Sequence, residues 1–265
     1  MARWILAALI VAACLLALPW ATGERRWQRY EPEMQHPAED PPDAWEKTEF
    51  SFARLRFRSP RDRFRWGHAR WGTDANKSER QFIVGLRRLT RIHARSVEEI
   101  VDIDSDEMFN WPWMYGVGIG DWELSDSHVA RLRKYFERGG FFMVDDFHNE
   151  REWGTFMAGI HRIFPGSTAV ELEDDDAIFH VVYDLSHRFQ VSGYQVIWGQ
   201  PYERGGVVPH WRAIKDDHGR VVVAMCFNMD LGDAWEWADY PPYPEKYSSM
   251  AYRMGVNYVL YAMTH

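Results

Sequence analysis

The stretch GGFFMVDDFH, residues 139–148, decides the fold class of this chain. Its apolar run at residues 141–144 is too short for a helix and suits a strand that is covered on both faces. Two carboxylates, Asp145 and Asp146, follow the run, and His148 comes two residues later. We therefore expect a buried strand with polar side chains at its carboxyl end.

The residues before this stretch predict an amphipathic helix over residues 124–138. Val129, Leu132 and Phe136 recur at roughly helical spacing. Ser125 suits the N-cap, and Gly139 suits the left-handed position that ends a helix. A helix, a glycine stop and a buried strand form the repeating unit of an open α/β sheet. Ligands of such sheets bind beyond the carboxyl ends of the strands.

The rest of the chain alternates in the same way, which favours an α/β layered fold. Helices are predicted at residues 76–90, 151–163 and 247–263. Strands are predicted at residues 50–57, 97–103, 113–119, 169–172 and 179–183, with a hairpin formed by residues 211–214 and 220–227. Residues 228–239 are polar and aromatic and follow the strongest strand of the second half.

The N-terminus predicts export or membrane attachment. Residues 1–23 contain a basic start, a 17-residue uncharged apolar run from residue 4 to residue 20, and small residues before a cleavage point. They fit a signal peptide or an N-terminal membrane anchor. Residues 24–48 are polar and proline-bearing and predict a flexible spacer. One α/β domain is expected at residues 49–265, in the periplasm or held at the inner membrane.

Composition restricts the classes of function. The 265 residues include 14 Trp and carry a net charge of −8, so tryptophan must fill the core or line a cleft. Residues 51–95 hold 13 Lys or Arg against three acids, and these bases either pair with the acidic remainder or form a binding face. No nucleic-acid-binding motif accompanies them, so a nucleic-acid partner is not expected.

Three polar clusters follow predicted strand ends and are the candidate site. They are Thr73-Asp74, the Asp145-Asp146-Phe147-His148 run, and Asn228 with Asp230, Asp233 and Glu236, beside Trp235. If the sheet is parallel, these clusters converge at one edge. Asp145, His148 and Asp230 are then candidate ligands of a divalent cation, although no other cofactor is expected.

Structural roles are the alternative for each cluster. Asp145 and Asp146 could cap the next helix and bond to neighbouring loops, and residues 230–233 could form a tight turn. His148 and His265 could be buried or hydrogen-bonded structural histidines. Adjacent residues of a regular strand also point to opposite faces, so at most one of Asp145 and Asp146 would be a ligand.

A nucleophilic enzyme is not predicted. No serine or cysteine lies in a G-x-S-x-G elbow. With Cys14 inside the N-terminal segment, Cys226 is the one cysteine of the domain, and its neighbours Met225 and Phe227 suit a packed strand. An intrachain disulfide is therefore not expected either.

Several motifs, in this order, resemble the bacterial DUF4159 family over residues 49–265. They are Phe52-Ala53-Arg54-Leu55, Thr73-Asp74, Leu86-Arg87-Arg88-Leu89-Thr90, GGFFMVDDF at residues 139–147, NMDLGDAWE at residues 228–236 and Gly255-Val256-Asn257-Tyr258. The resemblance implies a flavodoxin-like, class I glutamine amidotransferase-like fold, with a mostly parallel sheet between helices. It also implies export or membrane attachment, and genes near MoxR-type ATPases and von Willebrand A-type membrane proteins.

The chain departs from the family pattern at one place. Where the family suggests Asp-His-Pro before Ile-Phe-His, this sequence has Asp175-Asp176-Ala177. A catalytic histidine at that point is therefore in question. The amidotransferase cysteine elbow is absent as well, so glutaminase activity is not implied.

The leading hypothesis is a non-catalytic α/β binding domain of the bacterial envelope. Its cleft would use Asp74, Asp145, Asp146, His148, Asp230, Asp233 and Trp235, with Asn228 beside them, to hold a small ligand or an envelope or membrane protein. The alternative is a metal-assisted hydrolase that acts on an envelope substrate. A third hypothesis is that the basic residues 54–70 dock on anionic lipid or on an acidic partner.

Overall fold

The centre of the molecule is a sheet of mostly parallel strands. In the computed structural model, which describes residues 40–60 and 70–265, the sheet has seven strands in the order β2-β1-β3-β4-β7-β6-β5. The parallel strands are β1 (Ala53–Arg56), β2 (Glu99–Asp102), β3 (Trp113–Val117), β4 (Phe141–Phe147) and β7 (Val221–Phe227). β6 (His210–Lys215) and β5 (Val170–Glu171) extend one edge in antiparallel pairing. The predicted α/β fold with a mostly parallel sheet is confirmed.

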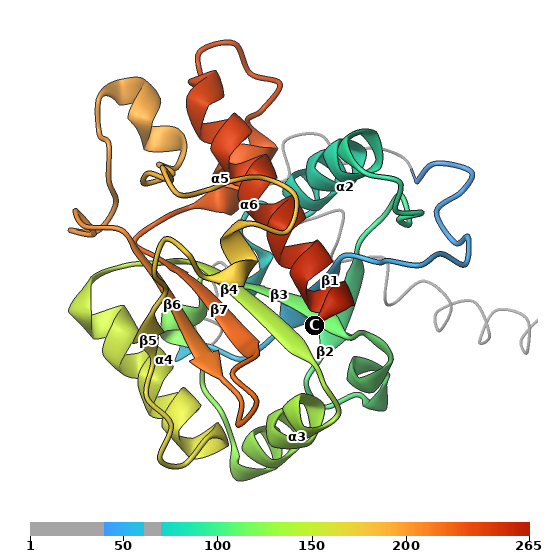
Figure 1. Cartoon of the computed structure of the whole chain (residues 1–265), viewed down its shortest axis with the longest axis vertical. Helices are drawn as coiled ribbons and strands as arrows, with labels where there is room; N and C mark the ends of the chain where they lie inside the picture. Colours follow the sequence, from blue (N-terminus) through green and yellow to red (C-terminus); the bar gives the residue numbers. More distant parts are fainter. Residues whose placement is uncertain (1–39, 61–69) are drawn as a thin grey trace, which may run out of the picture.

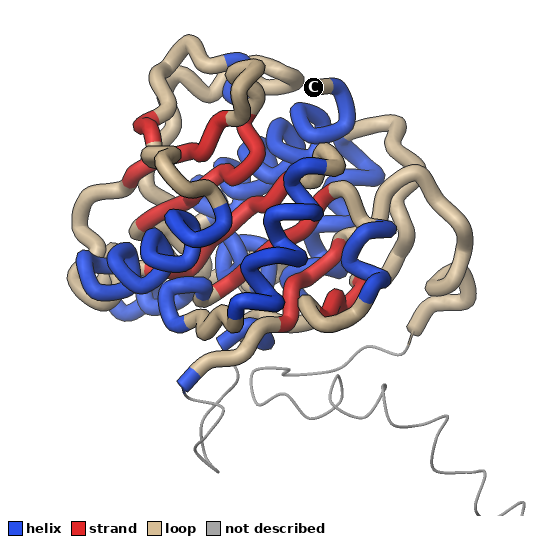
Figure 2. The backbone as a smooth tube through the Cα atoms, turned by 90° about the horizontal axis from the view of Figure 1, so that it is seen from below, coloured by secondary structure: helices blue, strands red, loops and turns tan. Residues whose placement is uncertain are grey.

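Helices cover both faces of this sheet (Figure 1), and Figure 2 shows the strands as a layer among them. One face carries α2 (Lys77–Leu89), α5 (Leu231–Glu236) and α6 (Glu245–Thr264). The other carries α3 (Asp126–Glu137) and α4 (Asn149–Ile163). Each face has its own apolar core, so the central strands are buried on both sides, as the continuous hydrophobic run of β4 predicts.

β4 departs from a regular strand at its carboxyl end. Phe141 and Met143 face the α2–α5–α6 core, whereas Phe142 and Val144 face the α3–α4 core. The pairing with β7 then shifts between Val144 and Phe147. Asp146 there has a φ of +47°, so it is the extra residue of a bulge. As a result Phe147 returns to the α3–α4 core, and Asp145 and Asp146 are parts of the strand rather than residues beyond it.

Two segments differ from the predicted elements. Residues 179–183 were expected as a strand, and that prediction is wrong: the segment has a 3-10 turn at Ala177–Phe179 and then bends. Its amides at Val182 and Tyr183 donate to the Asn257 side chain of α6, so they do not pair with a strand. Residues 231–236 form the short helix α5, with Asp230 as its N-cap, where a tight turn was the alternative.

The predicted signal or anchor at residues 1–23 lies outside the described residues. The last part of the expected spacer, residues 40–48, lies against α2: Asp40 pairs with Arg80, and Asp43 pairs with Arg87. Among residues 40–60 and 70–265, no helix is both long and apolar enough to span a bilayer.

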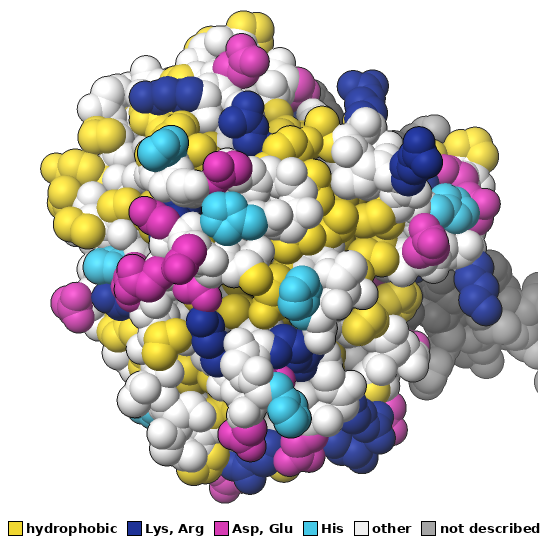
Figure 3. All heavy atoms as spheres, in the orientation of Figure 1, with side chains coloured by type: hydrophobic (Ala, Val, Ile, Leu, Met, Phe, Trp, Pro, Cys, Tyr) yellow, Lys and Arg dark blue, Asp and Glu magenta, His cyan; other side chains and the backbone are white. Residues whose placement is uncertain are grey.

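The basic segment is largely paired with acids wherever it is described. Arg54 is fully buried against Glu79, Arg56 pairs with Asp102, and Arg70 pairs with Asp121. Residues 61–69 of this segment lie outside the described part of the chain. On the face shown in Figure 3, acidic and basic side chains are interspersed and do not gather into one basic patch.

Candidate functional site

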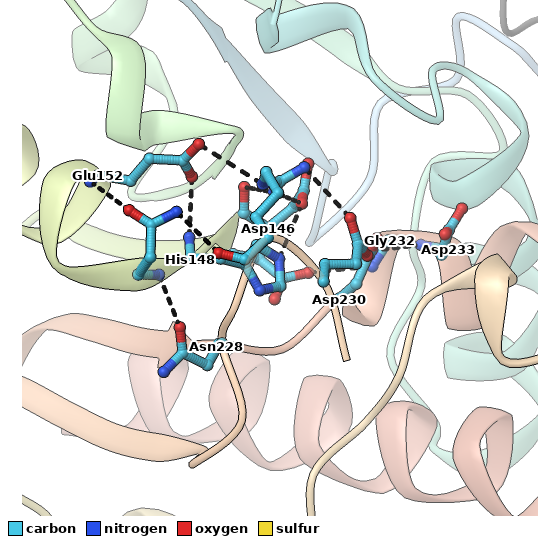
Figure 4. Close-up of polar contacts among 12 residues, drawn as sticks. Asp146, His148, Glu152, Asn228, Asp230, Gly232 and Asp233 are labelled. Atoms are coloured by element: carbon cyan, nitrogen blue, oxygen red, sulfur yellow. Dashed lines mark hydrogen bonds and ion pairs between the residues drawn. The ribbon is translucent and has the colours of Figure 1, made fainter. Parts of the chain in front are cut away.

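A polar pocket of about 390 Å³ lies beyond the carboxyl ends of β1, β4 and β7. Six carboxyl groups line it within the described part of the chain, from Asp74, Asp146, Glu203, Asp230, Asp233 and Glu236. Two guanidinium groups, from Arg70 and Arg204, and the aromatic rings of Tyr194, Trp198 and Trp237 complete most of the wall. Figure 4 shows Asp146, His148, Asp230 and Asp233 gathered at this edge of the sheet.

Asp145 has a structural position beside the pocket. Its Oδ2 accepts hydrogen bonds from the Tyr115 hydroxyl at 3.0 Å and from the backbone amides of Leu231 at 2.6 Å and Gly232 at 3.0 Å. The side chain is fully buried and does not line the pocket. Burial, with a contribution from the Asp146 carboxylate, raises the pKa of Asp145 to about 8. Asp145 therefore anchors the start of α5 on the central strand.

Asp146 lies in the pocket wall among two arginines and a histidine. Arg204 Nη2 lies 2.5 Å from its Oδ1, Arg70 Nη2 lies 3.5 Å from its Oδ2, and His148 Nε2 lies 3.1 Å from its Oδ1. Although burial opposes ionisation, these groups hold the pKa of Asp146 well below its usual range. Asp146 is therefore an ionised carboxylate whose charge is already neutralised by the protein.

His148 supports this cluster from behind. It precedes the first turn of α4, and its backbone amide donates to Glu152 Oε2 at 2.8 Å. The side chain is 2% exposed, and its Nδ1 has no hydrogen-bond partner in residues 40–60 and 70–265. The ring therefore orients Asp146 and is not itself part of the pocket lining.

The residues after β7 build the acidic side of the pocket. Asp230 is 3% exposed, and its Oδ1 accepts the Asp233 amide at 2.8 Å as the cap of α5. Asp233 in turn accepts the Tyr194 amide at 2.5 Å and the Trp237 indole N–H at 3.1 Å. These bonds fix both carboxyl groups, and α5 directs them to the same side as Asp146.

Crowding of like charges perturbs these two acids. Burial, followed by the charges of Asp233 and Asp74, raises the pKa of Asp230 well above its usual range. Burial raises the pKa of Asp233 to about 7, with a further contribution from Glu203. In both cases the carboxylate form is disfavoured because it lies among other carboxylates in a desolvated place.

The segment between β5 and β6 closes the pocket and was missed from the sequence. It carries Tyr194 and Trp198 on a short 3-10 helix, and then Glu203 and Arg204. No strand or helix period marks residues 199–209, so no sequence pattern placed Glu203 beside Asp230. The available signal was glycine punctuation among aromatic residues, with Gly199 and Gly205 both at positive φ.

The remaining predicted residues have structural positions. Trp235 is fully buried and packs on Phe52 and Phe82. Asn228 links loops, because its Oδ1 accepts the Asn149 amide at 3.0 Å and its Nδ2 donates to the Val208 carbonyl at 2.7 Å. Neither residue lines the pocket.

Three groups of side chains could hold a metal ion in the described residues. Each group has ligand atoms that lie within 4.8 Å of one another: Asp146 with His148 and Glu203, Asp74 with Asp233 and Glu236, and Glu203 with Asp230 and Asp233. Asp145, one of the predicted metal ligands, belongs to none of them. Asp233 belongs to two groups and Glu203 to two, so the carboxylates form one continuous chain around the pocket.

Cys226 does not have the environment of a catalytic nucleophile. Cys226 is fully buried within β7, and burial raises its pKa well above the ordinary value. A thiolate nucleophile must be reachable and ionised, so Cys226 is a core residue.

The chain matches a known family over most of its length. The model of a family described as a domain of unknown function, DUF4159, matches residues 51–263. No protein with a curated description matches the chain. The match covers nearly all of the residues that were expected to form the folded domain.

Proposed function

This chain belongs to the DUF4159 family, and from that premise we propose that it is a non-catalytic binding domain whose pocket captures a positively charged group. The observation that carries the proposal is the charge of the pocket. In the described part of the chain, six carboxyl groups and two guanidinium groups line a pocket of about 390 Å³.

Both arginines are committed to particular acids. Arg70 pairs with Asp121 and Asp146. Arg204 pairs with Asp146, with Glu152 and, through Nη1, with Glu203 Oε2 at 3.2 Å. In the described residues, the carboxyl groups without a basic partner therefore include Asp230 and Asp233.

A bound cation would stabilise these two groups in their ionised form. Carboxylates that are buried near one another are destabilising when ionised, and an opposite charge within about 4–6 Å favours their ionised form. Complementary charge also steers a ligand into a cleft and aligns it there. A cationic ligand is thus the class that the pocket favours most.

A metal-assisted hydrolase is the second candidate, and one observation favours it. Asp233 is shared by two of the carboxylate groups that could hold a cation, and a shared carboxylate is a common feature where two ions act together. In that case the substrate would be a component of the envelope.

The proposed location rests on the sequence of residues 1–23. We propose that this segment exports the domain or anchors it to the inner membrane, so that the pocket meets an envelope or membrane protein. Cell fractionation with and without residues 1–23 tests this. A protein that stays in the cytoplasmic fraction in both forms would contradict it.

The binding proposal is tested by thermal unfolding of the full chain at pH 8 with Mg²⁺, Ca²⁺, Mn²⁺ or organic amines. Asp230→Asn removes one pocket charge and keeps the helix cap, because Asn also suits an N-cap. Asp217→Asn, in the exposed β6–β7 turn, is the matched control. We expect at least one class of cation to raise the Tm of the wild type and of the control, but not of Asp230→Asn. Absence of a shift with every cation would overturn the proposal.

Elemental analysis of the purified chain separates the two candidates. A stoichiometric metal that is lost in Asp230→Asn, together with hydrolysis of an envelope substrate, would replace the binding domain by the hydrolase. Metal-free protein that still responds to a cationic organic ligand would support the binding domain.

A further inference from the structure

We propose that the pocket binds the ammonium or guanidinium group of an organic ligand, such as a basic side chain of a polypeptide, between Trp198 and the carboxylates of Glu203, Asp230 and Asp233. This inference rests on the proposed function and names its ligand class. Three features of the pocket carry it: its size, the convergence of its oxygen atoms, and its aromatic wall.

The size of the pocket suits an organic group. Small-molecule sites usually enclose about 300–1,000 Å³, and the pocket, at about 390 Å³, falls within that range. One water molecule occupies about 30 Å³ of liquid. A metal ion with a few waters would therefore leave most of this space unfilled.

Three carboxylate oxygens converge at Gly193. A Cβ on that residue would lie 2.4 Å from Glu203 Oε1, 2.6 Å from Asp233 Oδ2 and 2.8 Å from Asp230 Oδ2. The oxygens come from two separate segments and approach closely only because residue 193 has no side chain. Such a set matches an ammonium group, which offers three N–H donors, or a guanidinium group, which offers five.

Two of these oxygens are incompletely bonded. Glu203 Oε1 is buried and has no hydrogen-bond partner in residues 40–60 and 70–265. The Asp230 side chain is 97% buried and lines the pocket, and the hydrogen bond it accepts, from the Asp233 amide, is at Oδ1. Buried polar atoms are rarely left without a partner in native proteins. A ligand that donates hydrogen bonds would satisfy them.

Part of the pocket wall is aromatic and open to solvent. Trp198 is 67% exposed, and its ring meets Tyr194 edge-on at 4.8 Å. Tyr194 also stacks on Trp237 at 4.1 Å, so the three rings support one another. Aromatic rings attract organic cations through their negative faces, and Trp does so best.

The protein already uses this combination for one of its own ammonium groups. Lys77 Nζ lies 5.2 Å from the centre of the Trp237 ring and 3.0 Å from Asp239. An aromatic face and a carboxylate thus hold an ammonium on the neighbouring side of the same aromatic cluster. Hard metal ions prefer oxygen ligands and gain little from a ring. Trp198 therefore distinguishes an organic cation from a metal.

The test is isothermal titration of the full chain at pH 8 with four organic probes and with Ca²⁺. The probes are N-acetyl-lysine methylamide, N-acetyl-arginine methylamide, 1,5-diaminopentane and the neutral N-acetyl-norleucine methylamide. We expect the charged organic probes to bind and the norleucine probe not to bind. A preference for the amino-acid probes over the diamine would indicate a polypeptide ligand, and the reverse a free amine; either result supports the organic-cation class.

Three variants locate the binding. Asp230→Asn should weaken every organic cation by about tenfold or more, because it removes a buried charge partner. Trp198→Ala should weaken the organic cations by about fivefold, the size of a cation–π contact, and leave Ca²⁺ unaffected. Trp45→Ala, which alters an exposed tryptophan that does not line the pocket, should change neither.

The outcomes separate this inference from the proposed function. If Ca²⁺ binds and depends on Asp230 while no organic probe binds, the inference is wrong and the cation-binding function stands. If neither binds, both are wrong. If the organic probes bind equally well to Trp198→Ala, the aromatic recognition is wrong.

Discussion

Asp145 and Asp146 are adjacent in β4, yet their carboxyl groups have opposite environments. Asp145 accepts hydrogen bonds from Tyr115 and from the first amides of α5. Asp146 meets Arg70, Arg204 and His148. The pKa of Asp145 is raised to about 8, whereas that of Asp146 is lowered. Adjacent strand residues point to opposite faces, and the bulge at Asp146 adds a local turn of the backbone where the second carboxyl group lies in the pocket wall.

Replacement of Asp145 should reveal its structural role. Asp145→Ala leaves two backbone amides and a tyrosine hydroxyl without an acceptor, so we expect it to lower the free energy of unfolding by about 3 kcal/mol or more. Asp145→Asn keeps a carbonyl acceptor and resembles the protonated acid. We therefore expect it to lower the free energy of unfolding by about 1 kcal/mol near neutral pH. Denaturant unfolding measures both. Equal losses for the two variants would show that the charge of Asp145, rather than its oxygen, holds α5.

Replacement of Asp146 should lower the stability through the loss of its negative charge, so the effect should depend on pH. Asp146→Asn leaves Arg70 and Arg204 without their shared carboxylate, and breaking such a buried pair costs about 3 kcal/mol. Because the pKa of Asp146 is lowered on folding, its contribution is present above pH 4 and is lost as the pH falls towards its folded pKa. The difference in the free energy of unfolding between Asp146→Asn and the wild type should therefore become smaller as the pH falls below about 4. A difference that does not change with pH would contradict the ion pairs.

Much of the fold was predictable because it depends on local pattern. The buried run of β4 and the capped helix before it carry their own signals, and Ser125 does cap α3 by accepting the His128 amide. The strand expected at residues 179–183 failed because Asn257, distant in the sequence, takes its amides. No local pattern encodes that contact.

The candidate site was predictable only in part, for a similar reason. Asp146 lies near the carboxyl end of β4, and Asp74, Asp230 and Asp233 come after β1 and β7, so the topology brings them together. Glu203 reaches the same place through an irregular segment fixed by single contacts, such as the Gln190 side-chain amide on the Asn228 carbonyl at 2.8 Å. Asp145 does not join them: strand alternation allows only one of the two adjacent carboxyl groups to face the pocket, and that of Asp145 is bonded to Tyr115 and α5.

The stability of the unliganded protein should rise as the pH falls from about 7 to 4. The folded-state pKa values of Asp230 and Asp233 lie above the unfolded value near 3.9, that of Asp233 at about 7. Between these limits the folded state binds more protons than the unfolded state, so the contribution of these groups to stability falls as the pH rises. Thermal unfolding between pH 4 and 8 measures this.

Asp230→Asn provides the control for that pH effect. It removes the charge, so it should be more stable than the wild type at pH 8, by roughly 1–3 kcal/mol, and similar to it near pH 4. A bound cation should reduce this difference, because binding displaces the protons and neutralises the carboxylates. A variant that is less stable than the wild type at pH 8 would show that the carboxylates do not repel one another.

Gly193→Ala should weaken cation binding without straining the backbone. The new methyl group would lie 2.4–2.8 Å from the oxygens of Glu203, Asp230 and Asp233, so these carboxyl groups must move apart. The backbone φ of −72° accepts alanine without strain. We expect cation affinity to fall by about tenfold or more, since the three carboxyl groups can no longer contact the same cation.

Gly154→Ala is the matched control, because it adds a methyl to an exposed position of α4 with nothing within 4 Å. It should preserve affinity and add about 0.5–1 kcal/mol of stability, as alanine does within a helix. Unchanged cation binding in Gly193→Ala, measured by titration alongside this control, would place the bound cation away from the three converging oxygens.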